Sequence, residues 1–133
     1  MTELLYELDK LCDTILAINK NIQSAVIINK NGRAVEKKIR DSTVSQMPDH
    51  KNEMLLMQCA LTISMGRDFD EDYGPVGYAV IDRESTSMFS FPVGELIILV
   101  TSKKDISPIS LAKKITNTIQ EYKTKTLVES VSV

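Results

Sequence analysis

The sequence predicts one mixed α/β (α+β) domain, in which helices cover both faces of a five-stranded antiparallel sheet in the order α-β-β-α-β-β-β-α. Three observations lead to this prediction. The chain has 133 residues, 43% hydrophobic and 26% charged, which is typical of a single globular domain. Three segments repeat apolar residues every three or four positions, as amphipathic helices do. Five short segments of strand-forming residues lie between turn signals, and two of them are apolar almost throughout, which indicates strands covered on both faces.

In the first half of the chain, residues 4–18 are expected to form a helix whose stripe is Leu4, Leu8, Leu11, Ile15 and Ile18. Residues 22–28 then form a central strand. The pair Asn31-Gly32 predicts a tight turn into a second strand, residues 34–40, whose many charges are typical of a sheet edge. A middle helix is expected to begin with Asp49 as its N-cap.

In the second half, three strands at residues 76–81, 86–91 and 96–101 are expected to form an antiparallel meander. Ser107 is a typical capping residue, and Pro108 suits the first position of a last helix. The apolar pattern of that helix ends at Tyr122. We therefore predict a single domain over residues 1–122 and a flexible C-terminal tail over residues 123–133.

The net charge, the apolar runs and the cysteines limit which functions and compartments suit this chain. The 16 basic and 18 acidic residues give a net charge of −2, which argues against a nucleic-acid-binding protein. The longest strongly apolar run, residues 96–100, is too short to cross a membrane, and the acidic N-terminus does not resemble a signal peptide. Cys12 and Cys59 occupy apolar helical positions and are expected to be buried free thiols, as in a cytoplasmic protein.

The sequence offers no complete catalytic or metal-binding motif, so we expect neither an enzyme nor a cofactor. His50 is the only histidine, and Cys59 is expected to point into the core, where a thiol is usually inert. One histidine and two separated cysteines do not suit a structural zinc site. The five glycines match neither a P-loop nor a dinucleotide-binding fingerprint.

The acidic run at residues 68–72 carries carboxylates at alternate positions, as a calcium loop does. A calcium loop of the EF-hand type needs glycine at its sixth position and glutamate at its twelfth, but this chain has Tyr73 and Ala79 there. We interpret the run as a solvated loop. The carboxylates near turns, Asp82, Glu84 and Glu95, are interpreted as surface residues.

The middle helix has an unusual composition. Four of the six methionines lie in it or just before it, namely Met47, Met54, Met57 and Met65. Methionine is common at adaptable binding surfaces. Together with the leucines, these residues make the helix apolar on more than one face. Such a helix has to be buried twice, against its own sheet and against a partner.

The chain resembles the roadblock/LC7 family, which has a profilin-like fold, and in detail it also resembles an uncharacterised family of small archaeal proteins. The resemblance covers roughly residues 3–122. It is carried by the order of elements, the middle-helix segment 53–61, the Gly74-Pro75-Val76 segment and the turn at residues 91–94. It implies dimerisation through the middle helix and the following strand, and regulation of a small Ras-like GTPase or an adaptor role. The contacts it implies are Met54, Met57, Gln58, Leu61, Met65, Val76, Tyr78 and Val80.

Two functions remain open at this point. The first is a protein–protein interaction or scaffolding module that acts as a homodimer, with a small GTPase or another protein as its partner. The second is a PAS-like or profilin-like sensor of a small molecule. A sensor requires a cavity of a few hundred Å³, roughly the size of known ligand sites, between the sheet and its helices.

Overall fold

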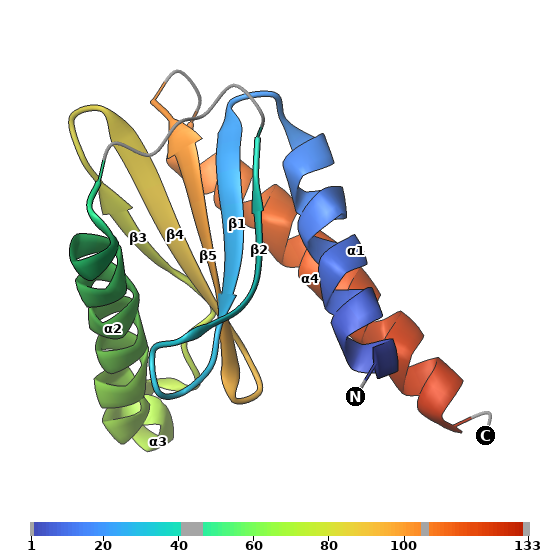
Figure 1. Cartoon of the computed structure of the whole chain (residues 1–133). Helices are drawn as coiled ribbons and strands as arrows, with labels where there is room; N and C mark the ends of the chain where they lie inside the picture. Colours follow the sequence, from blue (N-terminus) through green and yellow to red (C-terminus); the bar gives the residue numbers. More distant parts are fainter. Residues whose placement is uncertain (1, 41–46, 105–106, 132–133) are drawn as a thin grey trace.

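A five-stranded antiparallel sheet separates two helical layers (Figure 1). The computed structural model describes residues 2–40, 47–104 and 107–131. Its elements are α1 (Thr2–Ile18), β1 (Ile22–Ile28), β2 (Ala34–Ile39), α2 (Asp49–Gly66), the 3₁₀ helix η1 (Arg67–Phe69), α3 (Asp70–Tyr73), β3 (Ala79–Asp82), β4 (Thr86–Val93), β5 (Leu96–Lys103) and α4 (Pro108–Val131).

The strands lie in the order β2-β1-β5-β4-β3, and all neighbouring strands are antiparallel. The sheet therefore joins a hairpin, β1–β2, to a meander, β3–β4–β5. The two units meet where β1 pairs with β5, with Ala25 opposite Val100. The predicted fold class is confirmed, and so is the prediction that the charged second strand lies at an edge.

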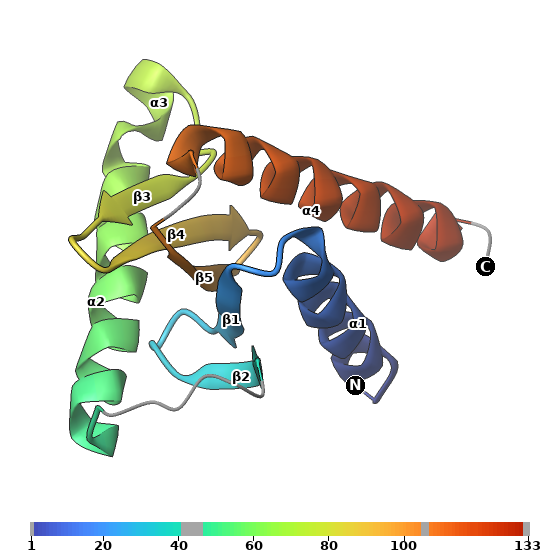
Figure 2. The ribbon, with the colours of Figure 1, turned by 90° about the horizontal axis from the view of Figure 1, so that it is seen from above.

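The two faces of the sheet are covered by different helices. The view from above shows α1 and α4 on one face and α2 on the other (Figure 2). The larger hydrophobic cluster lies on the side of α1 and α4 and includes Ile15, Ile27, Phe89, Phe91 and Ile115, which are almost fully buried. This cluster joins α1 and α4 to the sheet.

The smaller hydrophobic cluster lies between the sheet and α2. It consists of Ile28, Cys59, Ala60, Ile63, Ile97 and Leu99. The buried residues that α2 packs against the sheet are thus fewer and smaller than those that α1 and α4 pack against its opposite face. Consequently α2 is attached through a limited area.

The start of α2 differs from the prediction. The residue before the helix is Pro48, which has an extended backbone, and Asp49 is the first helical residue. Asp49 is therefore not the N-cap, because Pro48 already occupies the last non-helical position. The Asp49 carboxylate still lies in the first turn, where its negative charge interacts favourably with the helix dipole. At α4 the prediction is confirmed, since the helix begins at Pro108 and the amide of Ser110 lies 3.5 Å from Ser107 Oγ.

The acidic segment predicted as a loop is helical, and that prediction is wrong. Gly66 keeps a right-handed helical conformation, so the chain continues through η1 into α3. The break comes at Gly74, whose φ of 84° is open to glycine and whose amide donates to the Asp70 carbonyl at 2.8 Å. The position of the left-handed glycine, rather than the acidic composition, ends the helical region.

The last helix is longer than its apolar pattern indicates. Its backbone is helical to Val131, beyond the predicted end at Tyr122. Helical hydrogen bonds are local and form without a continuous apolar stripe. The domain boundary at residue 122 and the flexibility of residues 123–133 stay predictions.

The Arg40 guanidinium, which follows β2, forms hydrogen bonds to the end of α1 and to β1. Its Nη2 donates to the carbonyls of Leu16 and Asn19, and its Nε donates to the Ile22 carbonyl at 2.8 Å. The first two carbonyls lie at the C-terminal end of α1, which leaves such groups without helical partners. Arg40 therefore satisfies the end of α1 and joins it to β1.

We expect Arg40→Ala to lower the free energy of unfolding by about 2 kcal/mol, because it removes charged hydrogen bonds to half-buried carbonyls. Chemical denaturation measures this change. Arg83→Ala, at an exposed position between β3 and β4, is the matched control and should have little effect. Equal effects from both variants would show that Arg40 has no special role.

Both cysteines are free and buried, as predicted. Burial, together with the nearby carboxylates of Glu36 and Asp9, raises the pKa of the Cys12 thiol to about 12. Burial also raises the pKa of the Cys59 thiol. Both thiols are therefore held in their unreactive, protonated form.

We expect a thiol reagent at pH 8 to label neither cysteine in the native protein and both after unfolding.

The raised pKa of Cys12 makes the free energy of unfolding depend on pH. The stabilisation from keeping this thiol protonated is fully present below about pH 8.5, where a free thiol ionises, and is lost as the pH rises toward 12. Cys12→Ala should flatten this part of the stability profile in denaturant titrations. Rapid native labelling would contradict the burial of these thiols.

Candidate interaction surface on the middle helix

The helix α2 is apolar on two opposite sides. Its inner side faces the sheet through the buried residues Cys59, Ala60 and Ile63, and half-buried Leu55 and Leu56 pack beside them. The outer side of an amphipathic helix is normally polar, but in α2 exposed polar residues such as Gln58 and Ser64 lie among large exposed apolar ones. The helix thus covers one face of the sheet and also exposes apolar side chains on its opposite side.

The outer side carries four large apolar residues. The exposed fractions are 65% for Met54, 52% for Met57, 58% for Leu61 and 66% for Met65. Their spacing of three, four and four residues places them on one side of the helix. We call these four residues the exposed stripe. Gln58, also predicted as a contact, is exposed beside it.

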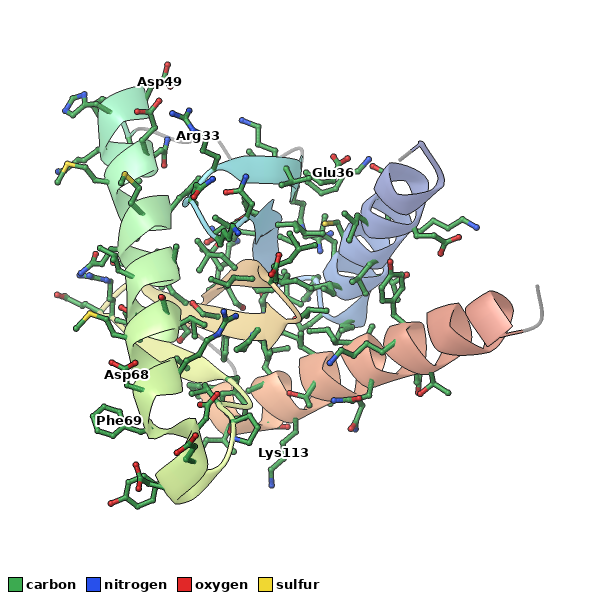
Figure 3. The ribbon with its side chains drawn as sticks, turned by 90° about the horizontal axis from the view of Figure 1, so that it is seen from below. Arg33, Glu36, Asp49, Asp68, Phe69 and Lys113 are labelled. Atoms are coloured by element: carbon green, nitrogen blue, oxygen red, sulfur yellow. The ribbon has the colours of Figure 1, made fainter. Side chains whose placement is uncertain are left out.

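Aromatic side chains extend the same surface beyond the end of α2. Phe69 in η1 is 59% exposed and Tyr73 in α3 is 89% exposed. The side chains of Asp68 and Phe69 project from the outer side of this end, opposite the end at Asp49 (Figure 3). Phe69 and Tyr73 are absent from the predicted contacts because their segment was predicted to be a loop. Their steps of four residues from Met65 carry the signal once the helix is known to continue.

The predicted strand contacts lie elsewhere. Val76 precedes β3 and packs against the smaller cluster under α2. Tyr78 and Val80 pack against the larger cluster, and the Tyr78 ring centroid lies 6.1 Å from that of Phe91. All three side chains are half-buried. The structure therefore groups the five helix residues on one surface and directs these three into the protein.

The strand β3 offers its backbone instead. Within the described part of the chain it pairs with β4 alone and forms one edge of the sheet. Its Ile81 side chain is 45% exposed. An edge strand presents free amide and carbonyl groups along its open side. This edge is suited to pairing with another strand.

The β1–β2 turn holds one part of the stripe in position. Gly32 has a φ of 80°, and a Cβ at this position would lie 3.0 Å from the Cα of Met57. Only glycine permits both this backbone conformation and this approach. The Asn31-Gly32 pair therefore forms the predicted turn and also lets the turn contact α2.

A groove of about 940 Å³ runs between the first half of α2 and the sheet. Its floor includes Val26, Met88 and Leu99, together with the hydroxyls of Ser24 and Thr101, which lie 2.6 Å apart. The charged side chains along it are Arg33, Lys37, Asp49 and Glu53. Arg33 lies between the β1–β2 turn and α2 (Figure 3). The groove arises because the contacts of α2 with the sheet are concentrated farther along the helix.

Asp82, one of the three carboxylates predicted as surface residues, has structural partners. Lys104 Nζ and Ser87 Oγ donate to Asp82, and these hydrogen bonds hold the pKa of the Asp82 carboxyl below its usual range. Lys38 Nζ lies 2.8 Å from Asp9, which joins β2 to α1. These contacts stabilise neighbouring elements and arrange no reactive group.

The structure does not bring His50 and Cys59 into one reactive environment. His50 is exposed at the start of α2, whereas Cys59 is buried on its inner side. The described residues contain no group of three or more His, Cys, Asp or Glu side chains that could hold a metal ion. None of the helices in the described ranges is both long and apolar enough to cross a membrane.

Comparison with solved structures identifies the fold. A roadblock/LC7 domain from Streptomyces avermitilis superimposes with a TM-score of 0.66 at 14% identity, covering 90% of this chain and 97% of that one. The gliding protein MglB from Thermus thermophilus gives 0.67 at 11% identity, with 88% of each chain covered. MglB from Myxococcus xanthus gives 0.65 at 12% identity, covering 91% and 90%.

Profilin is a further structural neighbour. The Schizosaccharomyces pombe protein gives a TM-score of 0.60 at 13% identity, covering 89% of this chain and 97% of that one. No protein-family model and no curated protein matches the sequence. The likeness therefore lies in the fold, and it confirms the resemblance inferred from the sequence at that level: the chain has a roadblock/LC7-like, profilin-related fold.

Proposed function

We propose that this chain is a protein–protein interaction module that acts as a homodimer through the exposed stripe of α2 and the open edge of β3. The observation that carries this proposal is the exposed stripe itself. Four large apolar side chains on one helix face form a contiguous patch, which is unusual on a monomeric protein and typical of an interface. The exposed aromatic residues Phe69 and Tyr73 enlarge the patch.

The energetics favour a partner for this surface. Removing apolar area from water stabilises a complex by roughly 25 cal/mol per Å². Methionine side chains adapt their shape to a partner at little cost. The open edge of β3 adds directional backbone hydrogen bonds to a contact that the stripe would make mainly through apolar packing. These two features lie at the helix and the strand that the roadblock resemblance implies.

The same resemblance supports a regulatory or scaffolding role toward a small Ras-like GTPase, with the dimer as the binding unit. One solved structure of MglB is described as having a tetrameric arrangement, so that protein assembles beyond a single chain. The buried free thiols fit a reducing compartment, which supports a cytoplasmic location. In this proposal the chain acts by binding and carries out no catalysis.

Light scattering on a size-exclusion column tests the dimer. One chain weighs 14.9 kDa, so a dimer weighs twice that, about 29.8 kDa. We expect the dimer mass across a tenfold dilution, and we expect Leu61→Asp to give the mass of one chain, because a charge inside an apolar interface is costly. Gln120→Asp, at an exposed position on α4, is the matched control and should leave the dimer intact.

A native protein that has the mass of a single chain at every concentration would contradict the proposed homodimer. If Leu61→Asp and Gln120→Asp both kept the dimer, a dimer would exist but the exposed stripe would not form it. Far-ultraviolet circular dichroism of each variant separates these outcomes from loss of the fold.

The groove favours a second candidate function, the binding of a small molecule. Its volume of about 940 Å³ meets the size expected of a ligand site, and its floor combines apolar side chains with a hydroxyl pair. The cations Arg33 and Lys37 suit a ligand with an apolar body and an anionic group. Such a ligand would contact the sheet and α2 together.

The probe 1-anilinonaphthalene-8-sulfonate has this chemistry and reports binding by its fluorescence. In a Leu61→Asp background, which weakens binding at the exposed stripe, we expect the groove to enhance its fluorescence. Thr101→Trp should abolish the enhancement by filling the groove, while Asn117→Trp on α4 should not. No enhancement, or equal loss in both variants, would remove the ligand-binding candidate. Thermal unfolding checks that each variant folds.

A further inference from the structure

The two walls of the groove carry opposite charges. The β1–β2 turn and β2 place Arg33 and Lys37 along one wall, and the first turns of α2 place Asp49 and Glu53 along the other. All four side chains are exposed, and within the described part of the chain none of them forms an ion pair. Because the two cations and two anions balance, the groove as a whole favours neither a simple anion nor a simple cation.

The two walls touch at one end of the groove. A Cβ at Gly32 would lie 3.0 Å from the Cα of Met57, so the β1–β2 turn contacts α2 there. Arg33 follows Gly32 directly, and Glu53 lies about one helical turn before Met57. Arg33 projects between the turn and α2 (Figure 3). The basic and the acidic wall are therefore brought close together at this end.

The floor of the groove becomes apolar away from the basic wall. Lys37 pairs across the sheet with Val26, and Val26 pairs with Leu99, so the three side chains form one row on the face that α2 covers. Met88 on β4 continues this floor. Neighbouring strands lie about 4.8 Å apart, so the floor from β2 to β4 spans about 14 Å. The charged end thus opens onto a surface that suits an apolar body.

We propose that the groove binds a zwitterion with an apolar body, namely an apolar amino acid or a dipeptide of apolar residues. Its carboxylate lies against Arg33 and Lys37, its ammonium lies against Asp49 and Glu53, and its apolar side chains lie on the floor. This inference rests on the ligand-binding candidate above and names its ligand class. A guanidinium holds a carboxylate through two parallel hydrogen bonds, and the apolar area removed from water adds affinity.

Isothermal titration calorimetry of the native protein tests the ligand class. L-phenylalanine and the dipeptide L-phenylalanyl-L-leucine carry both charges, N-acetyl-L-phenylalanine carries the carboxylate alone, and L-phenylalaninamide carries the ammonium alone. We expect at least one of the two zwitterions to bind about fivefold more tightly than both singly charged compounds, because each of those lacks one ionic contact. The tighter of the two zwitterions identifies the source of the ligand as a free amino acid or a dipeptide.

Charge variants assign each wall to one group of the ligand. Arg33→Gln should weaken the zwitterion about fivefold and leave L-phenylalaninamide unchanged, because that compound has no carboxylate. Glu53→Gln should weaken the zwitterion by a similar factor and leave N-acetyl-L-phenylalanine unchanged, because that compound has no ammonium. Arg83→Gln and Glu121→Gln, at exposed positions outside the groove, are the matched controls and should change no affinity. Circular dichroism checks that each variant folds.

The outcomes separate this inference from the proposed function. If neither zwitterion binds more tightly than the singly charged compounds, while Thr101→Trp still abolishes the fluorescence of the anilinonaphthalene probe, the groove is a ligand site and only the ligand class is wrong. Zwitterion binding that survives Thr101→Trp would place the ligand outside the groove and overturn this inference. If neither the zwitterions nor the probe bind, the ligand-binding candidate and this inference fall together. Light scattering without ligand measures the homodimer independently.

Discussion

The pairing of β1 with β5 is the contact on which the rest of the fold depends. It joins residues 75 positions apart along the chain, such as Ala25 and Val100, and places both strands in the middle of the sheet. Both strands are covered on two faces, so each contributes to both hydrophobic clusters. The hairpin and the meander are each local, and only this pairing turns them into one sheet. The helices then have a continuous surface to cover.

The two helical layers are unequal, and this inequality gives α2 its properties. The helices α1 and α4 bury large side chains against the sheet, whereas α2 is held by small residues such as Cys59 and Ala60 and by the turn at Gly32. Its outer side keeps the exposed stripe, and its first half leaves a groove beside the sheet. The candidate interaction surface and the candidate ligand site thus follow from one cause, the limited inner contact of this helix.

Polar side chains in this structure largely support the fold. Arg40 closes the end of α1, Lys38 joins β2 to α1, and Asp82 is held by Lys104 and Ser87. Apart from Ile109 on α4, the most exposed large apolar residues in the described part of the chain lie on α2 and on its continuation through η1 and α3. This division supports the proposed binding role, because large apolar side chains of α2 stay exposed to solvent.

The sequence by itself determined the element order, the edge strand, the Asn31-Gly32 turn, the start of α4 at Pro108 and the buried cysteines, because periodicity and turn chemistry are local. It also indicated that α2 has two apolar sides. Only the tertiary structure decided which side is exposed, that Tyr78 and Val80 point into the larger cluster, and that a groove lies beside α2. It also showed that the acidic segment is helical and extends the surface to Phe69. The exposed side of α2, the burial of Tyr78 and Val80, and the groove depend on contacts between residues far apart along the chain, which no local pattern records.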